Sequence, residues 1–93
     1  MKIYGNLMEK YIQIKDQFEK HRDKEKAVKM AKYMKNKFKF YGIATPLRKN
    51  IYKEILKKEK NTPTIDWQLL DQCFQDEHRE FQYFVIDYLK INL

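Results

Sequence analysis

The sequence predicts an all-α fold of about five helices, and three features carry this prediction. Apolar residues recur at steps of three and four along most of the chain, which is the period of a helix. Only two glycines and two prolines occur among the 93 residues. Asp23, Thr45 and Asp66 stand where the capping side chains of helices are expected. A chain of this length predicts one small helical domain, residues 1–93.

The first predicted helix runs from about Ile3 to Lys20. Its apolar stripe consists of Tyr4, Leu7, Tyr11, Ile14 and Phe18. The second helix has Asp23 as its N-cap and continues to about Lys35. On a helical projection Tyr33 borders the apolar side of this helix and lies among lysines 26, 29 and 37. We therefore expect Tyr33 to be exposed on a basic face.

The third predicted helix starts at Thr45 and Pro46 and runs to about Lys58. Thr45 has the hydroxyl of an N-cap, and proline is favoured at the first helical position. Arg48 falls within the apolar arc of this helix, so its guanidinium needs a carboxylate, backbone carbonyls or a phosphate. Two positions are open: an inward ion pair with Glu80, which we favour slightly, or a phosphate contact.

The remaining chain predicts two further helices after a loop at residues 61–64. Asp66 can cap a short helix in which Trp67 and Cys73 are expected in the core. The last helix begins near residues 76–79, and its apolar residues are Phe81, Phe84, Val85, Tyr88 and Leu89. This surface exceeds what two helix pairs are expected to cover, which predicts self-association through the C-terminal helix.

The charge is divided unevenly along the chain. Residues 1–60 hold 18 lysines and arginines against 7 acidic residues, a net charge of +11, whereas residues 61–93 have −4. A basic segment of this kind indicates an anionic partner, although solvated lysine faces are also common. The sequence contains no run of about 18 apolar residues, so no membrane span is predicted. The single cysteine, Cys73, and the absence of a signal-peptide pattern predict a cytoplasmic location.

Two stretches resemble a known family. Residues 33–48 read Tyr-Met-Lys-Asn-Lys-Phe-Lys-Phe-Tyr-Gly-Ile-Ala-Thr-Pro-Leu-Arg, and residues 79–82 read Arg-Glu-Phe-Gln, with Asp87 following. Together they resemble the N-terminal part of the AlkD-like DNA alkylation repair proteins. These are DNA glycosylases built from HEAT-like helical repeats, which remove alkylated bases such as 3-methyladenine and 7-methylguanine. The resemblance implies a stack of helix pairs that forms the N-terminal portion of a longer fold.

The resemblance also implies a site and a partner. Tyr33, Thr45 and Arg48 match the family motif, and Lys35 and Lys49 are neighbours expected to reach phosphates. The implied partner is double-stranded DNA with alkylated bases. No position matches the catalytic Asp and Trp residues of the family, so the expected role is DNA binding without catalysis by this segment.

No metal site and no organic cofactor are expected, since the sequence has no phosphate loop and no cluster with metal-ligand spacing. Two other functions fit the same composition. One is a non-enzymatic HEAT-like scaffold for protein interaction, and the other is a self-associating helical module.

Overall fold

The computed structural model describes residues 5–92, and five helices make up most of this part. They are α1 (Gly5–Lys20), α2 (Lys24–Tyr33), α3 (Thr45–Lys60), α4 (Trp67–Gln75) and α5 (Arg79–Asn92). The described residues form no strand and only one isolated bridge, between Lys39 and His78. The predicted all-α fold is therefore confirmed. The predicted start of the first helix at Ile3, and Tyr4 of its stripe, lie outside the described residues, as does the side chain of Leu7.

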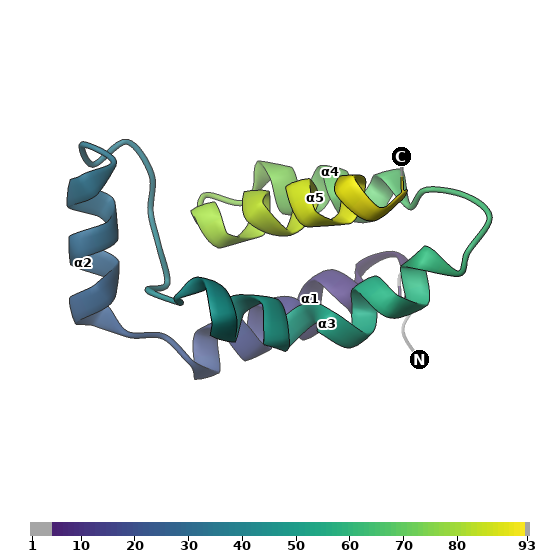
Figure 1. Ribbon diagram of the computed structural model, residues 1–93, viewed down its shortest axis with the longest axis horizontal. Coiled ribbons are helices and arrows are strands. Elements are labelled where there is room, and N and C mark those ends of the chain that lie inside the picture. Colours follow the sequence, from purple (N-terminus) through teal and green to yellow (C-terminus); the bar gives the residue numbers. More distant parts are fainter. Residues whose placement is uncertain (1–4, 93) are drawn as a thin grey trace.

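Four of the helices lie along one another, and α2 stands crosswise at one end (Figure 1). Contacts join α1 to α3, α3 to α5, α5 to α4 and α4 to α1, so each of these four helices has two packing neighbours. Helix α2 packs on none of the other described helices and contains no buried residue. The molecule therefore consists of a four-helix body and a projecting helix.

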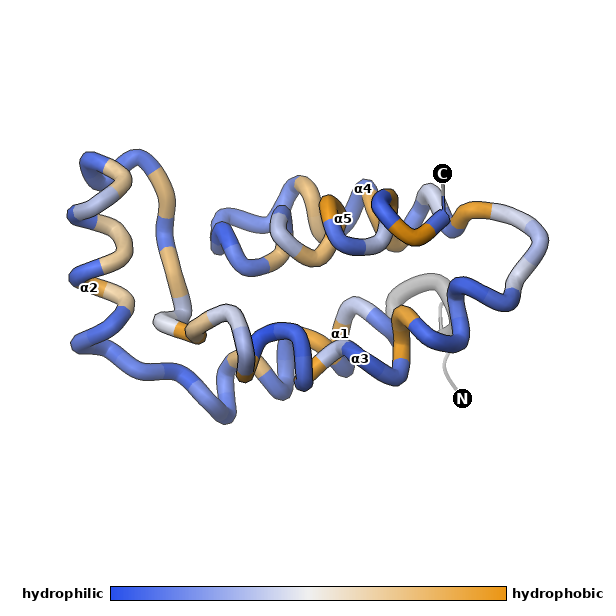
Figure 2. Tube along the Cα trace, in the orientation of Figure 1, coloured by the Kyte–Doolittle hydropathy of each residue, from blue (hydrophilic) through white to orange (hydrophobic). Residues whose placement is uncertain are grey.

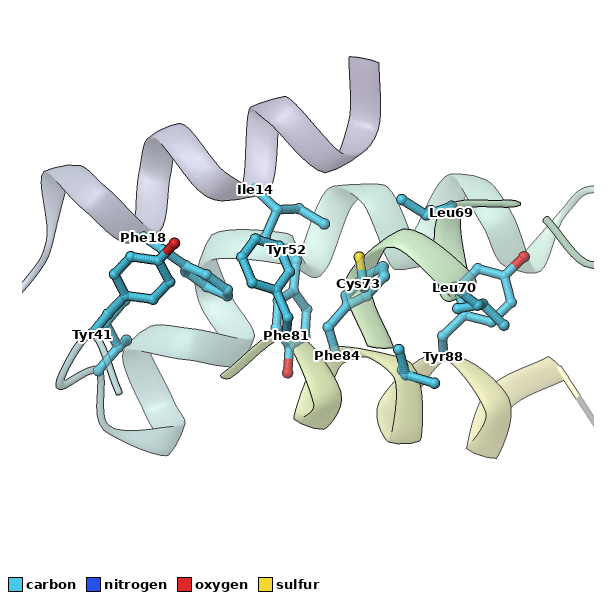
Figure 3. Close-up of a cluster of buried hydrophobic side chains, with 12 residues drawn as sticks. Ile14, Phe18, Tyr41, Tyr52, Leu69, Leu70, Cys73, Phe81, Phe84 and Tyr88 are labelled. Carbon is cyan, nitrogen blue, oxygen red and sulfur yellow. The ribbon is translucent and has the colours of Figure 1, made fainter. Parts of the chain in front are cut away.

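Aromatic side chains dominate the core of the four-helix body. Figure 3 shows them pointing into the space between the helices. The buried apolar residues are Ile14, Phe18, Tyr41, Ile43, Tyr52, Leu69, Leu70, Cys73, Phe81, Phe84, Val85 and Tyr88. The expectation that α5 lacks cover for these residues is wrong, because α3 and α4 both pack against α5 and bury Phe84 and Tyr88 completely.

The exposed apolar surface lies instead on α4. Trp67 is 63% exposed and Phe74 is 64% exposed, so the prediction that Trp67 belongs to the core is wrong. Leu69 and Cys73 face the core of the protein, and at 100° per residue Trp67 falls on nearly the opposite side of the helix from Leu69. The prediction for Cys73 is confirmed by its complete burial.

Two of the three predicted helix caps are present. The carboxylate of Asp23 accepts a hydrogen bond from the amide of Lys26, and that of Asp66 accepts one from Leu69, both at 3.1 Å. The prediction of Thr45 as an N-cap is wrong, because Ala44 occupies this position and supplies no side-chain bond. Thr45 is the first residue of α3, and its hydroxyl lies beside Arg48.

The connector at residues 34–44 joins α2 to α3; residues 35–37 are hydrophilic, and hydrophobic residues become frequent from Phe38 onward (Figure 2). Gly42 has a φ of +93°, which is strained for any residue with a side chain. A Cβ atom there would lie 2.1 Å from the backbone oxygen of Asp23. The amide of Asp23 also donates a hydrogen bond of 2.9 Å to the carbonyl of Tyr41. Only glycine therefore lets the connector lie this close to the start of α2.

In the described part of the chain, no helix has the length and apolar character needed to cross a membrane.

Candidate functional site

A pocket of about 360 Å³ lies where α2, the connector, α3 and α5 meet. Its lining residues are Lys29, Met30, Tyr33, Met34, Phe40, Ile43, Thr45, Arg48 and Tyr83. Three of the five predicted site residues, Tyr33, Thr45 and Arg48, are thus brought together although they come from two different helices. The pocket combines aromatic and thioether side chains with two cationic ones.

Tyr33 ends α2 and is 87% exposed at the edge of this pocket, as the lysine-rich surroundings of this residue predicted. Lys35, which follows shortly after, is exposed and has a φ of 58°, as does Asn36. This left-handed turn ends the helix two residues earlier than the sequence predicted. Lys35 consequently lies in the turn after α2, and it does not line the pocket.

Arg48 is almost buried, with 8% of its surface exposed, and it does not pair with Glu80. Its Nε donates to the hydroxyl of Tyr52 at 2.9 Å, and its guanidinium lies 4.6 Å from the ring centroid of Tyr83. Its nearest carboxylate is Asp87, at 3.7 Å from Nη2, which is an ion pair without a close hydrogen bond. The expected partner for Arg48 is therefore wrong, while its inward position is correct.

Glu80 instead binds the backbone of the connector. Its side chain is fully buried, and its two carboxylate oxygens accept hydrogen bonds from three successive backbone amides, those of Tyr41, Gly42 and Ile43, at 3.0, 3.0 and 3.2 Å. Three N–H groups satisfy the charge of Glu80 in place of a cation. This bond set fixes the connector against α5 and holds Ile43 in the pocket wall.

Sequence reasoning missed the partners of Arg48 on α5. These partners are Tyr83 and Asp87, which lie four residues apart on one ridge of the helix, and Arg79, four residues earlier, lies over the ring of Tyr83. Asp87 accepts a hydrogen bond of 2.5 Å from the hydroxyl of Tyr52. Burial and this hydrogen bond raise the pKa of Tyr52, so the hydroxyl keeps its proton as a donor. Polar residues at steps of four in an apolar helix were the signal available in the sequence.

Lys49, the fifth predicted site residue, lines a neighbouring groove of about 660 Å³ between α3 and α5. Lys49, Lys53 and Lys57 follow at steps of four along α3, and Lys90 of α5 lines the same groove. None of these lysines forms an ion pair within the described part of the chain. The groove and the pocket are adjacent, because Asp87 lines the groove and also faces Arg48.

A second polar network supports the connector from the other side. Asp76 accepts hydrogen bonds from the hydroxyl of Tyr11 at 2.6 Å and from the backbone amide of His78 at 2.8 Å. Burial alone would raise the pKa of Asp76, but these hydrogen bonds and His78 outweigh it and lower the pKa. The ring of His78 stacks on Tyr41, with 3.8 Å between centroids.

The described residues bring together no group of three or more side chains suited to hold a metal ion. No carboxylate lines the pocket, and the two beside its lining residues are both engaged: Asp87 by Arg48 and Tyr52, and Glu80 by three backbone amides. The arrangement can therefore bind an anion through Arg48, Lys29 and Lys49 while aromatic residues contact an apolar or planar group.

Comparison with known proteins gives a family. The model of the DNA alkylation repair enzyme family matches residues 14–92, which include every residue of the pocket and the groove. No curated protein and no solved structure matches the chain. Because the family match extends over most of the 93 residues, the chain belongs to the DNA alkylation repair enzyme family.

Proposed function

We propose that the chain binds double-stranded DNA in alkylation repair, with the pocket and the lysine groove as the contact surface. The observation that carries the proposal is the junction of exposed Tyr33 and buried Arg48 in a segment with a net charge of +11. The cationic groups neutralise phosphates, and the aromatic group contacts sugars or bases. Alkylated duplex DNA is the substrate class that the family implies.

The geometry of Arg48 supports a phosphate contact. Its charge faces one carboxylate at 3.7 Å, and the first turn of α3, which has no side-chain cap, lies beside it. Backbone amides at the start of a helix favour anions. Thr45 adds a hydroxyl at 3.5 Å from the guanidinium. Arg48 thus retains attraction for a phosphate even while it is paired inside the protein.

Tyr33→Ala provides the test of the proposal. Fluorescence anisotropy with a labelled duplex should show binding that is weakened about fivefold, because the substitution removes one aromatic contact to sugars or bases, which contributes on the order of 1 kcal/mol. The melting temperature should change little, since Tyr33 is 87% exposed. Phe74→Ala is the matched control, because it removes a similarly exposed aromatic group from α4. Equal effects of the two substitutions, or no duplex binding by the parent chain, would overturn the proposal.

We further propose that this chain binds without cleaving the N-glycosidic bond by itself. Cleavage requires a group that stabilises the developing positive charge, and the carboxylates beside the pocket are already held, Asp87 by Arg48 and Tyr52 and Glu80 by backbone amides. Release of 7-methylguanine from methylated DNA is the direct assay. Release above the level of a protein-free control would contradict this proposal and leave the DNA-binding proposal intact.

A second candidate function is self-association through α4 in place of α5. Trp67 and Phe74 are exposed seven residues apart, on one face of α4, beside a groove of about 600 Å³ that Leu70 and Leu89 also line. A second copy fits this face by charge, because residues 61–93 have a net charge of −4 and residues 1–60 have +11. Such an arrangement would be head to tail.

Sedimentation of the chain at several concentrations tests self-association. We expect a dimer or larger species that dissociates as salt screens the opposite charges. Phe74→Asp should abolish the association without unfolding the protein, because Phe74 is 64% exposed. A monomer at every concentration would overturn this second candidate.

A further inference from the structure

We propose that the pocket between α2, α3 and α5 receives a single unpaired, uncharged nucleobase of the bound DNA. This inference rests on the proposed DNA binding and specifies what enters the pocket. Its volume of about 360 Å³ lies within the range of small-ligand pockets, and it has the usual combination of apolar walls with few polar groups. Contacts to the outside of a duplex would leave these walls unused.

The walls suit the faces of a planar ring. Tyr33, Phe40 and Tyr83 supply aromatic groups from α2, the connector and α5, and Met30 and Met34 supply polarizable thioethers. Bases stack on aromatic side chains irrespective of their sequence. A base inside a duplex has both faces covered by its neighbours, so only an unpaired base displaced from the stack can use these walls.

Polar groups lie where the phosphate of such a nucleotide would be. Arg48 and Thr45 line the pocket at the start of α3, and Lys29 lines it from α2. The first turn of α3 receives no side-chain cap, which leaves its amides for an anion. Aromatic walls beside these groups match a base with its attached phosphate.

The charge of the pocket decides which base fits. Arg48 and Lys29 are cationic, and no carboxylate lines the pocket. Alkylation at a ring nitrogen makes a purine cationic, so the pocket repels such a base and accepts an uncharged one. The preferred occupant is thus an unmodified base, such as the partner that loses its pairing when the damaged base is displaced.

The pocket is preorganised to hold a ligand. Glu80 fixes the amides of Tyr41, Gly42 and Ile43 by three hydrogen bonds, and Gly42 lets the connector touch the start of α2. The wall formed by Phe40 and Ile43 therefore keeps its position before any ligand binds, which reduces the entropy lost on binding.

The test compares four labelled duplexes that carry one bulged nucleotide: adenine, an abasic site, N6-methyladenine, which is uncharged, or N1-methyladenine, which is cationic. An intact duplex is the reference. The parent chain should bind the adenine bulge about tenfold more tightly than the abasic bulge, the effect expected from stacking one base. It should bind the N6-methyladenine bulge more tightly than the N1-methyladenine bulge, which has the same size.

Tyr33→Ala should remove most of the preference for a base over an abasic site, and Tyr33→Phe should keep it. Equal affinity for the adenine and abasic bulges, together with normal binding of the intact duplex, would overturn the pocket proposal and leave the DNA-binding proposal standing. Equal affinity for the two methylated adenines would overturn the selection by charge. Failure to bind any of the duplexes would overturn the DNA-binding proposal itself.

Discussion

Helix α3 has a buried charged residue near each end, and the two are satisfied in different ways. Arg48 ends its first turn and Glu59 is its penultimate residue, with exposed fractions of 8% and 3%. Each opposes the helix dipole, since a cation is unfavourable near the N-terminus and an anion near the C-terminus. Partners from other elements must therefore hold both residues.

At the C-terminal end of α3, the charge of Glu59 is fully paired within the protein. Lys10 forms a short ion pair with Glu59 and a second one with Asp66 at 3.2 Å, and the hydroxyl of Tyr88 donates to Glu59 at 2.8 Å. Burial alone would lower the pKa of Lys10, but the two carboxylates outweigh it and raise the pKa. These contacts join α1, α3, α4 and α5 and complete the shell around Glu59.

At the N-terminal end of α3, beside the pocket, the charge of Arg48 is less completely paired. Arg48 has one carboxylate at 3.7 Å, a tyrosine hydroxyl and an aromatic ring as its partners, and it lines a pocket. Burial of a charge by itself therefore does not distinguish a structural residue from a functional one. Glu59 has its charge neutralised within the fold, whereas the charge of Arg48 is only partly paired and, in the proposed function, is available to a phosphate.

The largest difference is expected between Glu80→Gln and Glu59→Gln. Glutamine at position 80 turns an amide group toward buried backbone N–H groups and leaves at least one without an acceptor, a loss of about 3 kcal/mol in the free energy of unfolding. Glutamine at position 59 can still accept from Lys10 with its oxygen, and its amide group can donate to the hydroxyl of Tyr88, which can rotate to accept, so its loss should be about 1 kcal/mol. Urea unfolding of both variants measures the difference, and equal losses would contradict it.

Arg48→Ala is expected to have the next largest effect. It leaves Asp87 without its cation, although Tyr52 still donates to Asp87, and because Asp87 is partly exposed the loss should be about 2–3 kcal/mol in unfolding free energy. Adding Asp87→Ala should recover about 1 kcal/mol, the coupling expected of contacting residues. Adding Glu80→Gln should recover nothing, since the hydrogen bonds and ion pairs of Glu80 and Arg48 involve different residues. If stability did recover in the Arg48→Ala, Glu80→Gln double variant, the result would support the Arg48–Glu80 ion pair that the sequence predicted.

A smaller effect concerns the acid stability of the connector. The folded pKa of Asp76 is lowered, so Asp76 stabilises the fold above its unfolded pKa of about 3.9. This contribution disappears as the pH falls through the lower folded pKa. Asp76→Asn should cost about 1 kcal/mol at pH 7 and should flatten the loss of stability below about pH 4. Thermal melts of the parent and the variant from pH 2 to 7 measure this effect. An equally steep loss of stability below about pH 4 in both proteins would contradict the prediction.

The sequence predicted the helices and two of the helix caps because these depend on local spacing. It predicted the exposure of Tyr33 for the same reason. It failed for Trp67, whose exposure depends on the rotation of α4 against α1 and α5. It failed also for Glu80, because a carboxylate bound by three backbone amides leaves no complementary charge to find in the sequence.

The smallest expected effect concerns the salt dependence of DNA binding and compares two neighbouring lysines on different sides of α3. Lys57 lines the groove between α3 and α5, whereas Lys58 lines a different groove beside Lys10 and Glu59. Both are exposed, so alanine at either position should leave stability within about 0.5 kcal/mol of the parent. Each phosphate that is neutralised changes the slope of log K against log salt concentration by about 0.9. Lys57→Ala should therefore reduce the slope for duplex DNA by up to about 0.9, and Lys58→Ala should leave it nearly unchanged. The two variants have the same net charge, so equal slopes would mean that DNA responds to the overall charge of the protein and that the groove has no special role.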